Sequence, residues 1–130
     1  MLPELIGIDH LHIYVNDKAL AEAWYQKVLG FKVVEHLSNR TTSTGPLTLS
    51  DTNNRINLAI FERENYSSIT SIAFKTNGEN FLLWKKRLED FESLTRCVDH
   101  EVSFSLYFND PFGHNHEITS YEHSYIREHV

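Results

Sequence analysis

The chain has 130 residues, a hydrophobic fraction of 41% and a formal net charge of −6. These values fit one domain with a single core. No run of Lys or Arg could follow a nucleic-acid backbone, and no apolar stretch reaches the length of about 20 residues that spans a bilayer. The single cysteine, Cys97, cannot form an internal disulfide. We therefore expect a cytoplasmic protein that binds neither nucleic acid nor a membrane.

The first half of the chain alternates between strand and helix patterns. Residues Ile6–Val15 alternate in the way that a strand does. Asn16 and Asp17 can cap the start of a helix over Ala19–Leu29, and Gly30 is the residue type that commonly ends a helix in the left-handed conformation. The next segments are predicted to be a strand, a loop and two further strands, over Phe31–Leu37, Ser38–Pro46, Leu47–Ser50 and Ile56–Phe61.

The second half repeats this order of elements. A strand is predicted over Ile69–Thr76 and a helix over Glu79–Leu88. Trp24 in the first helix and Trp84 in the second are expected to pack between helix and sheet. Because the strand-to-helix separations of the two halves differ by only one residue, we infer an internal duplication. The remaining strands are predicted near Leu94–Val98, over Val102–Phe108 and over His114–Thr119, with a turn at Asp110–Gly113 between the last two.

Two stretches of the chain resemble a known superfamily. Ile8–Asp17, Ala23–Tyr25 and Val28–Phe31 are similar to the opening of glyoxalase-like and fosfomycin-resistance-like proteins. The segment Ser105–Ile118 resembles their closing hairpin. The chain thus resembles the vicinal oxygen chelate superfamily, which includes glyoxalases, bleomycin-resistance and fosfomycin-resistance proteins and extradiol dioxygenases.

This resemblance implies an α+β fold. Two paired βαβββ modules would form a curved mixed-sheet cup, with the helices outside. Module 1 would span about residues 5–62 and module 2 about residues 68–120, in a single domain over residues 1–130 that ends in a short helix at about residues 121–130. Members of the superfamily usually dimerise, so the resemblance also implies a homodimer.

The resemblance further implies a divalent metal ion in the cup, such as Zn, Mn, Fe or Ni. The ligand positions fall on His10 and Glu117, whose imidazole and carboxylate suit these ions. The other two positions fall on Ser71 and Asn57, whose neutral oxygens are weaker ligands. His12 shares a strand face with His10, but their Cα atoms would lie about 6.5–7 Å apart, which we expect to strain joint coordination of one ion. His12 is therefore predicted to act on the substrate as an acid, a base or a hydrogen-bond donor.

Other polar residues of the closing hairpin are further candidates. Ser105 and Tyr107 match positions that face the substrate in fosfomycin-resistance-like relatives, and they share one strand face. Glu117 joins His12 as a candidate catalytic residue, since either side chain could move a proton. His116 should face the side opposite to Glu117, and His114 lies at the turn, so both are expected on the surface.

Two functions are open at this point. The first is a divergent metal-dependent enzyme of the lyase, isomerase or ring-cleavage type that acts on a small oxygenated substrate, and the retained pair His10 and Glu117 favours it. The second is a metal-independent protein of the bleomycin-resistance type that binds a drug or metabolite. The neutral side chains of Ser71 and Asn57 and the eight Phe and six Tyr of the chain favour this alternative.

Overall fold

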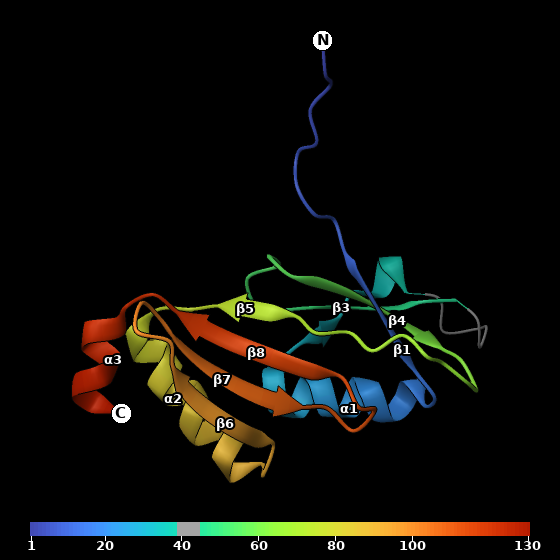
Figure 1. Ribbon diagram of the computed structural model, residues 1–130. Coiled ribbons are helices and arrows are strands. Elements are labelled where there is room, and N and C mark those ends of the chain that lie inside the picture. Colours follow the sequence, from blue (N-terminus) through green and yellow to red (C-terminus); the bar gives the residue numbers. More distant parts are fainter. Residues whose placement is uncertain (39–44) are drawn as a thin grey trace. The chain divides into compact units, whose positions relative to one another are not determined.

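The first half of the chain folds into a four-stranded sheet with a helix against one face (Figure 1). The computed structural model describes residues 1–38 and 45–130. The strands follow the order β1-β4-β3-β2, in which β1 is parallel to β4 and the other neighbours are antiparallel. The elements are β1 (Leu11–Val15), α1 (Lys18–Leu29), β2 (Lys32–Val33), the short 3₁₀-helix η1 (Glu35–Leu37), β3 (Leu47–Ser50) and β4 (Asn57–Glu62).

The second half repeats this topology. Its strand order is β5-β8-β7-β6, again with the first strand parallel to the last. The predicted duplication and the α+β class are therefore confirmed, and both sheets are open. The elements are β5 (Ala73–Lys75), α2 (Gly78–Asp90), β6 (Leu94–Asp99), β7 (Phe104–Asn109), β8 (Asn115–Ser120) and α3 (His123–His129).

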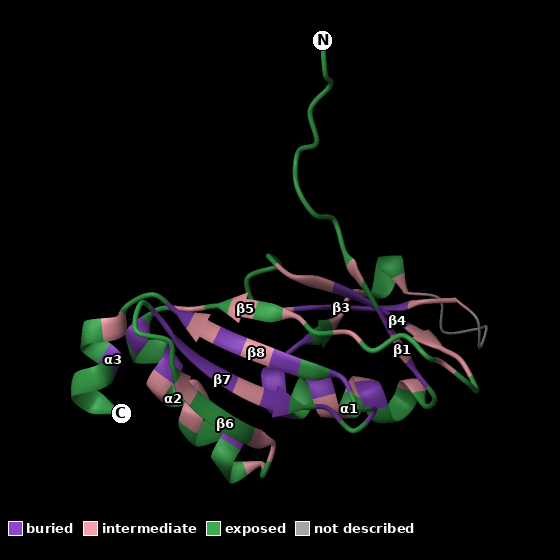
Figure 2. Cartoon of the chain, in the orientation of Figure 1, coloured by how far each residue is buried: buried purple, intermediate pink, exposed green. Residues whose placement is uncertain are grey.

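The chain divides into two compact units, which we call unit 1 (Met1–Ser67) and unit 2 (Ser68–Val130). Each has its own sheet and its own buried core of apolar side chains (Figure 2). In the described part of the chain, no helix has the length and apolar character needed to cross a bilayer.

The helices begin and end where local chemistry requires. The side chain of Asp17 accepts a hydrogen bond from the backbone N–H of Leu20 at the start of α1. Gly30 ends this helix at φ 76°, a left-handed conformation that glycine adopts without a steric penalty. Both predicted signals are thus confirmed. In α2 the cap is Asn77, whose side chain accepts from the N–H of Asn80.

The two tryptophans of the helices are less buried than predicted. Tyr25 of α1 and Phe81 of α2 are fully buried. Trp24 and Trp84, which we expected between helix and sheet, are only partly buried. The buried residues of α1 are Ala21, Tyr25, Val28 and Leu29, so Trp24 lies at the edge of the apolar stripe.

Two predicted strands are shorter than expected. The segment from Ile6 to His10 is exposed and precedes β1, as Figures 1 and 2 show. The alternation in this segment is not matched by pairing, because β4 begins at Asn57 and its ladder with β1 begins at Leu11 opposite Leu58. The predicted strand Phe31–Leu37 consists of the two residues of β2 followed by η1. Most of the predicted loop Ser38–Pro46 lies outside the described residues.

Alternation along the strands gives each sheet two different faces. In unit 2, Leu106, Phe108 and Ile118 are buried on the face that packs with α2. The opposite face carries the cross-strand pairs Ser105 with Thr119 and Tyr107 with Glu117, and we call these four residues the polar face of unit 2. The predicted substrate-side residues of the closing hairpin therefore lie together.

Candidate metal and substrate site

Glu117 is held in a defined orientation on the polar face of unit 2. It lies on β8 between Ala73 of β5 and Tyr107 of β7, and it is partly exposed. The hydroxyl of Ser105 donates a hydrogen bond of 2.6 Å to its Oε2 atom. Thr119 Oγ1 lies 3.3 Å from the same Ser105 hydroxyl and donates to a backbone carbonyl. A hydrogen bond from a neighbour that fixes a carboxylate is the arrangement that prepares a ligand for a metal ion.

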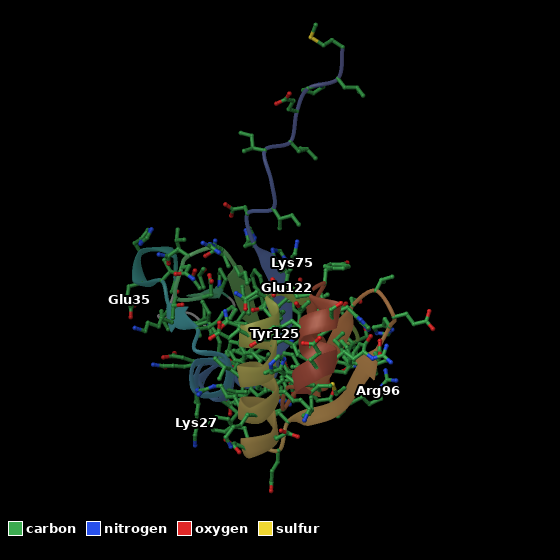
Figure 3. The ribbon with its side chains drawn as sticks, turned by 90° about the vertical axis from the view of Figure 1, so that its left-hand side faces the viewer. Lys27, Glu35, Lys75, Arg96, Glu122 and Tyr125 are labelled. Carbon is green, nitrogen blue, oxygen red and sulfur yellow. The ribbon has the colours of Figure 1, made fainter. Side chains whose placement is uncertain are left out.

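Two cations lie on the edge strands, β5 and β6, of the sheet that contains Glu117. The guanidinium of Arg96 on β6 lies 4.6 Å from the ring centroid of Tyr107. Lys75 lies opposite Thr119 in the ladder between β5 and β8; Figure 3 labels both cations. The hydroxyl of Tyr107 lies 3.1 Å from Nε2 of His100. These groups suit a small molecule with several oxygens or a negative charge.

Sequence reasoning missed Arg96 and His100. The residue pattern of β6 does not mark Arg96, because its position over Tyr107 depends on the pairing of β6 with β7. His100 follows β6 in the turn before β7, where strand alternation gives no guide to the direction of a side chain. The pairing register locates Arg96 opposite Tyr107. His100 is located by its contact with the Tyr107 hydroxyl.

Ser71 is exposed, two residues before β5. The backbone around it is attached to β8 by the imidazoles of His114 and His116. Nδ1 of His114 accepts from the N–H of Thr70 at 2.9 Å, and Nδ1 of His116 accepts from the N–H of Ile72 at 3.2 Å. The two histidines therefore position the segment that contains Ser71.

The expectation that His114 and His116 are surface residues is wrong. Both are fully buried, with 0% exposure. His116 does face away from Glu117, as alternation predicts, but that side of the sheet is the core face rather than solvent. Its ring lies 5.9 Å from that of Phe74 and 5.7 Å from that of Phe108, between centroids.

Burial of His116 predicts a loss of stability in acid. Burial lowers the pKa of His116 from 6.5 to about 4, with His114 as a further cause and Asp110 opposing. Between these values the unfolded chain binds the proton and the folded chain does not, so stability falls as pH falls. We expect the loss from this residue to reach about 3 kcal/mol near pH 4.

The variant His116→Gln tests this expectation, because glutamine stays neutral throughout this range. The free energy of unfolding of both proteins is measured in urea at pH 7, 6, 5 and 4. It should fall less steeply with decreasing pH in the variant than in wild-type protein. Parallel curves for the two proteins would show that His116 does not cause the acid sensitivity.

In unit 1, His10 and His12 lie against each other. Their Nε2 atoms are 3.0 Å apart, and their rings stack with centroids 4.9 Å apart. Nδ1 of His10 lies 2.8 Å from Oδ2 of Asp9. The two imidazoles thus lean together, although their backbone positions are two residues apart.

Asn57 lies beside this pair. Its side-chain amide donates a hydrogen bond of 3.3 Å to the backbone carbonyl of Asp9. Asn57 thereby attaches the residue before His10 to the start of β4, which is a positioning contact. Its amide oxygen is a weak donor for a metal ion, as the sequence indicated.

Aromatic rings continue the same side of unit 1 along β1 and β4. His12 lies 4.8 Å from Phe61 and Tyr14 lies 5.6 Å from Phe61, between centroids. The guanidinium of Arg63 lies 5.4 Å from the ring of Phe61 and 5.9 Å from that of Tyr14. We call His12, Tyr14 and Phe61 the aromatic face of unit 1.

The donors divide between the two units. Among the described residues, no group of three or more His, Cys, Asp or Glu side chains is gathered as a metal cluster. Unit 1 offers the imidazole of His10, whose Nδ1 is hydrogen-bonded to the Asp9 carboxylate. Unit 2 offers the carboxylate of Glu117, whose Oε2 accepts a hydrogen bond from the Ser105 hydroxyl. An imidazole and a carboxylate with such neighbours fit a divalent ion such as zinc, manganese, iron or nickel.

The fold, the repeated topology and the motifs of the sequence agree with one family. Residues 7–118 match the family model of the Glyoxalase/Bleomycin resistance protein/Dioxygenase superfamily. The chain belongs to this superfamily. The predicted membership of the vicinal oxygen chelate superfamily is thereby confirmed.

Similar proteins within this superfamily include enzymes. The chain is 32% identical over 124 residues to the metallothiol transferase FosB of Bacillus licheniformis, covering 88% of this chain and 75% of FosB. The structure resembles a lactoylglutathione lyase of Agrobacterium tumefaciens, with TM-score 0.74, 20% identity, and 92% and 97% coverage of the two chains. It also resembles the fosfomycin resistance protein FosX of Listeria monocytogenes in a complex with Mn(II) and a dihydroxypropylphosphonic acid, with TM-score 0.74, 17% identity, and 90% and 93% coverage.

Proposed function

We propose that this protein is a divalent-metal-dependent enzyme that acts on a small oxygenated substrate. The observation that carries the proposal is the hydrogen bond from Ser105 to Glu117, because it orients an otherwise accessible carboxylate on a polar sheet face. The identity to the metallothiol transferase FosB supports a metal-dependent reaction. The reaction types in the proposal are lyase, isomerase and ring-cleavage chemistry.

His10 and Glu117 are the proposed ligands. The two ligands can come from one chain or from two copies of the chain. When bound, the ion would polarise neighbouring oxygens of the substrate. Ser71 and Asn57 would line the site as neutral groups.

The polar face of unit 2 would bind and orient the substrate. Tyr107 offers its hydroxyl to substrate oxygens, whereas Ser105, predicted to face the substrate, is 1% exposed and acts by orienting Glu117. The nearby cations Lys75 and Arg96 favour a negatively charged group. Proton transfer is proposed for Glu117 or for His12, as the sequence indicated. This arrangement would select a compact molecule that carries an anionic group next to two oxygens.

A metal titration tests the proposal. Protein freed of metal by a chelator and then dialysed is titrated with Mn²⁺, Zn²⁺, Ni²⁺ and Fe²⁺ in a calorimeter. We expect at least one ion to bind well below a dissociation constant of about 1 mM, which corresponds to about 4 kcal/mol. Binding that is no tighter than this for all four ions would refute the metal-dependent proposal.

The aromatic face of unit 1 supports a second candidate function, binding of a drug or metabolite without a metal. Tyr14 and Phe61 stack, and the guanidinium of Arg63 lies over both rings, so a flat ligand that is neutral or anionic could be held without a metal. The two functions differ in their response to a chelator. A metal-dependent protein loses the stabilisation that bound ion provides, so its melting temperature falls when EDTA is added. An unchanged melting temperature would favour the binding protein.

A further inference from the structure

We propose that His10 and His12 form a chelating pair, in which His12 supplies the second imidazole ligand of the metal site. The inference rests on the proposed metal-dependent function and deepens it. It assigns to unit 1 a metal-binding element made of two residues on one stretch of chain. It also replaces the role of His12 in acting on the substrate with a role as a metal ligand.

The distance between the two imidazoles fits joint coordination. Their Nε2 atoms lie 3.0 Å apart. Imidazole nitrogens bind zinc at about 2.0–2.1 Å, so two of them at right angles around one ion lie about 3.0 Å apart. Both histidines therefore bring an Nε2 atom to the separation that two neighbouring ligands of an octahedral ion require.

Asp9 prepares His10 for this role. With Nδ1 of His10 donating to Oδ2 of Asp9 at 2.8 Å, Nε2 of the neutral ring carries a lone pair. A carboxylate on the far nitrogen of a metal-bound histidine fixes its tautomer and increases its basicity. Asn57, which donates to the backbone carbonyl of Asp9, attaches this residue to β4.

His12 is oriented by its neighbours on the aromatic face. Its ring lies 4.8 Å from that of Phe61 and 6.4 Å from that of Tyr14, between centroids. In the present arrangement Nε2–H of His12 donates to Nε2 of His10. When both rings bind an ion, the neutral His12 carries its proton on Nδ1 instead, so each ring offers one lone pair and no net proton is released.

The pair compensates for the neutral Ser71. His10 and His12 supply two imidazoles from one stretch of chain in unit 1. Two imidazoles together with one carboxylate leave open positions on an octahedral ion and are typical of Fe²⁺ sites. His12 would then bind the ion rather than transfer a proton.

The test compares the metal affinities of single variants of the full chain. Metal-free wild-type protein and the variants His10→Ala, His12→Ala and Glu117→Gln are titrated with Zn²⁺ and Ni²⁺ by calorimetry. His36→Ala is the matched control, because His36 is an exposed histidine of the same unit outside the pair. We expect His12→Ala to lower the affinity at least about tenfold, as loss of even an indirect partner of a ligand does, and His36→Ala to leave it unchanged.

A spectroscopic measurement on the unmodified protein separates a ligand from a positioning residue. One equivalent of Cu²⁺ is bound, and the nitrogen hyperfine pattern in the electron paramagnetic resonance spectrum is recorded. Two imidazole nitrogens are expected in wild-type protein and one in His12→Ala. One nitrogen in both proteins would overturn the pair.

The remaining outcomes distinguish this inference from the proposed function. If His12→Ala binds like wild type while His10→Ala and Glu117→Gln lose affinity, the pair is refuted and the proposed function stands. If both histidine variants lose affinity and Glu117→Gln does not, the pair stands and the proposed site with Glu117 fails. If wild-type protein binds neither ion, the pair is refuted, and the proposed function is refuted as well only when Mn²⁺ and Fe²⁺ also fail to bind.

Discussion

Replacing Glu117 with glutamine is expected to weaken the binding of divalent ions by at least about a hundredfold. The substitution keeps the size of the side chain but removes the negative charge, and an amide oxygen is a poor ligand for these ions. Loss of a residue that only supports a ligand costs 10–100-fold, so loss of a ligand should cost no less. The fold should be retained, because Glu117 is partly exposed and Ser105 can still donate to the amide oxygen.

Calorimetric titration of Glu117→Gln with the tightest-binding ion measures this effect. Glu128→Gln is the matched control, because Glu128 is an exposed glutamate of α3 in the same unit. The control removes the same charge from unit 2 and should bind like wild type. Equal affinities of the two variants would show that net charge, and not the position of Glu117, governs the binding.

The second large effect concerns stability. Leu88 of α2 is fully buried, whereas Leu83 of the same helix is 62% exposed. Removing a buried leucine side chain costs the transfer free energy of its methyl and methylene groups and leaves a cavity, so Leu88→Ala should lower the free energy of unfolding by about 2–5 kcal/mol.

Leu83→Ala is the control for this prediction, since it makes the same change in helix propensity at an exposed position. It should change the free energy of unfolding by no more than about 0.5 kcal/mol. Urea unfolding followed by circular dichroism at 222 nm measures both. Equal losses for the two variants would mean that the buried face of α2 has been misidentified.

Much of the fold could be predicted because the signals are local. Asp17 and Gly30 mark the ends of α1 by hydrogen bonding and backbone conformation, which depend on a few neighbouring residues. The repeated order of strand and helix patterns predicted the two halves of the chain. Strand ends were predicted less well. Ile6–His10 has the alternation of a strand, yet pairing with β4 begins only at Leu11.

Part of the site could be predicted because strand alternation is also a local signal. Alternation correctly grouped Ser105 and Tyr107 on one face and separated His116 from Glu117. It could not show that the opposite face was the core, because that depends on where α2 packs. Alternation alone therefore predicts a surface position for His116, whereas its burial depends on tertiary packing.

The relation between His10 and His12 lay beyond sequence reasoning. The spacing of two residues fixes the Cα separation on a strand, but side-chain torsions decide how far apart the reactive nitrogens are. The two rings lean together, so the nitrogens are 3.0 Å apart. The carboxylate of Asp9, the residue before His10, also contacts the His10 ring.

Anomalous scattering shows directly whether His10 and Glu117 bind one divalent ion. Crystals are grown without chelator, soaked in Zn²⁺, and measured on both sides of the absorption edge of zinc. We expect an anomalous peak about 2.0–2.2 Å from Nε2 of His10 and from a carboxylate oxygen of Glu117, supplied by one chain or by two copies. A fully soaked crystal with no peak there, or with the only peak at other side chains, would contradict it.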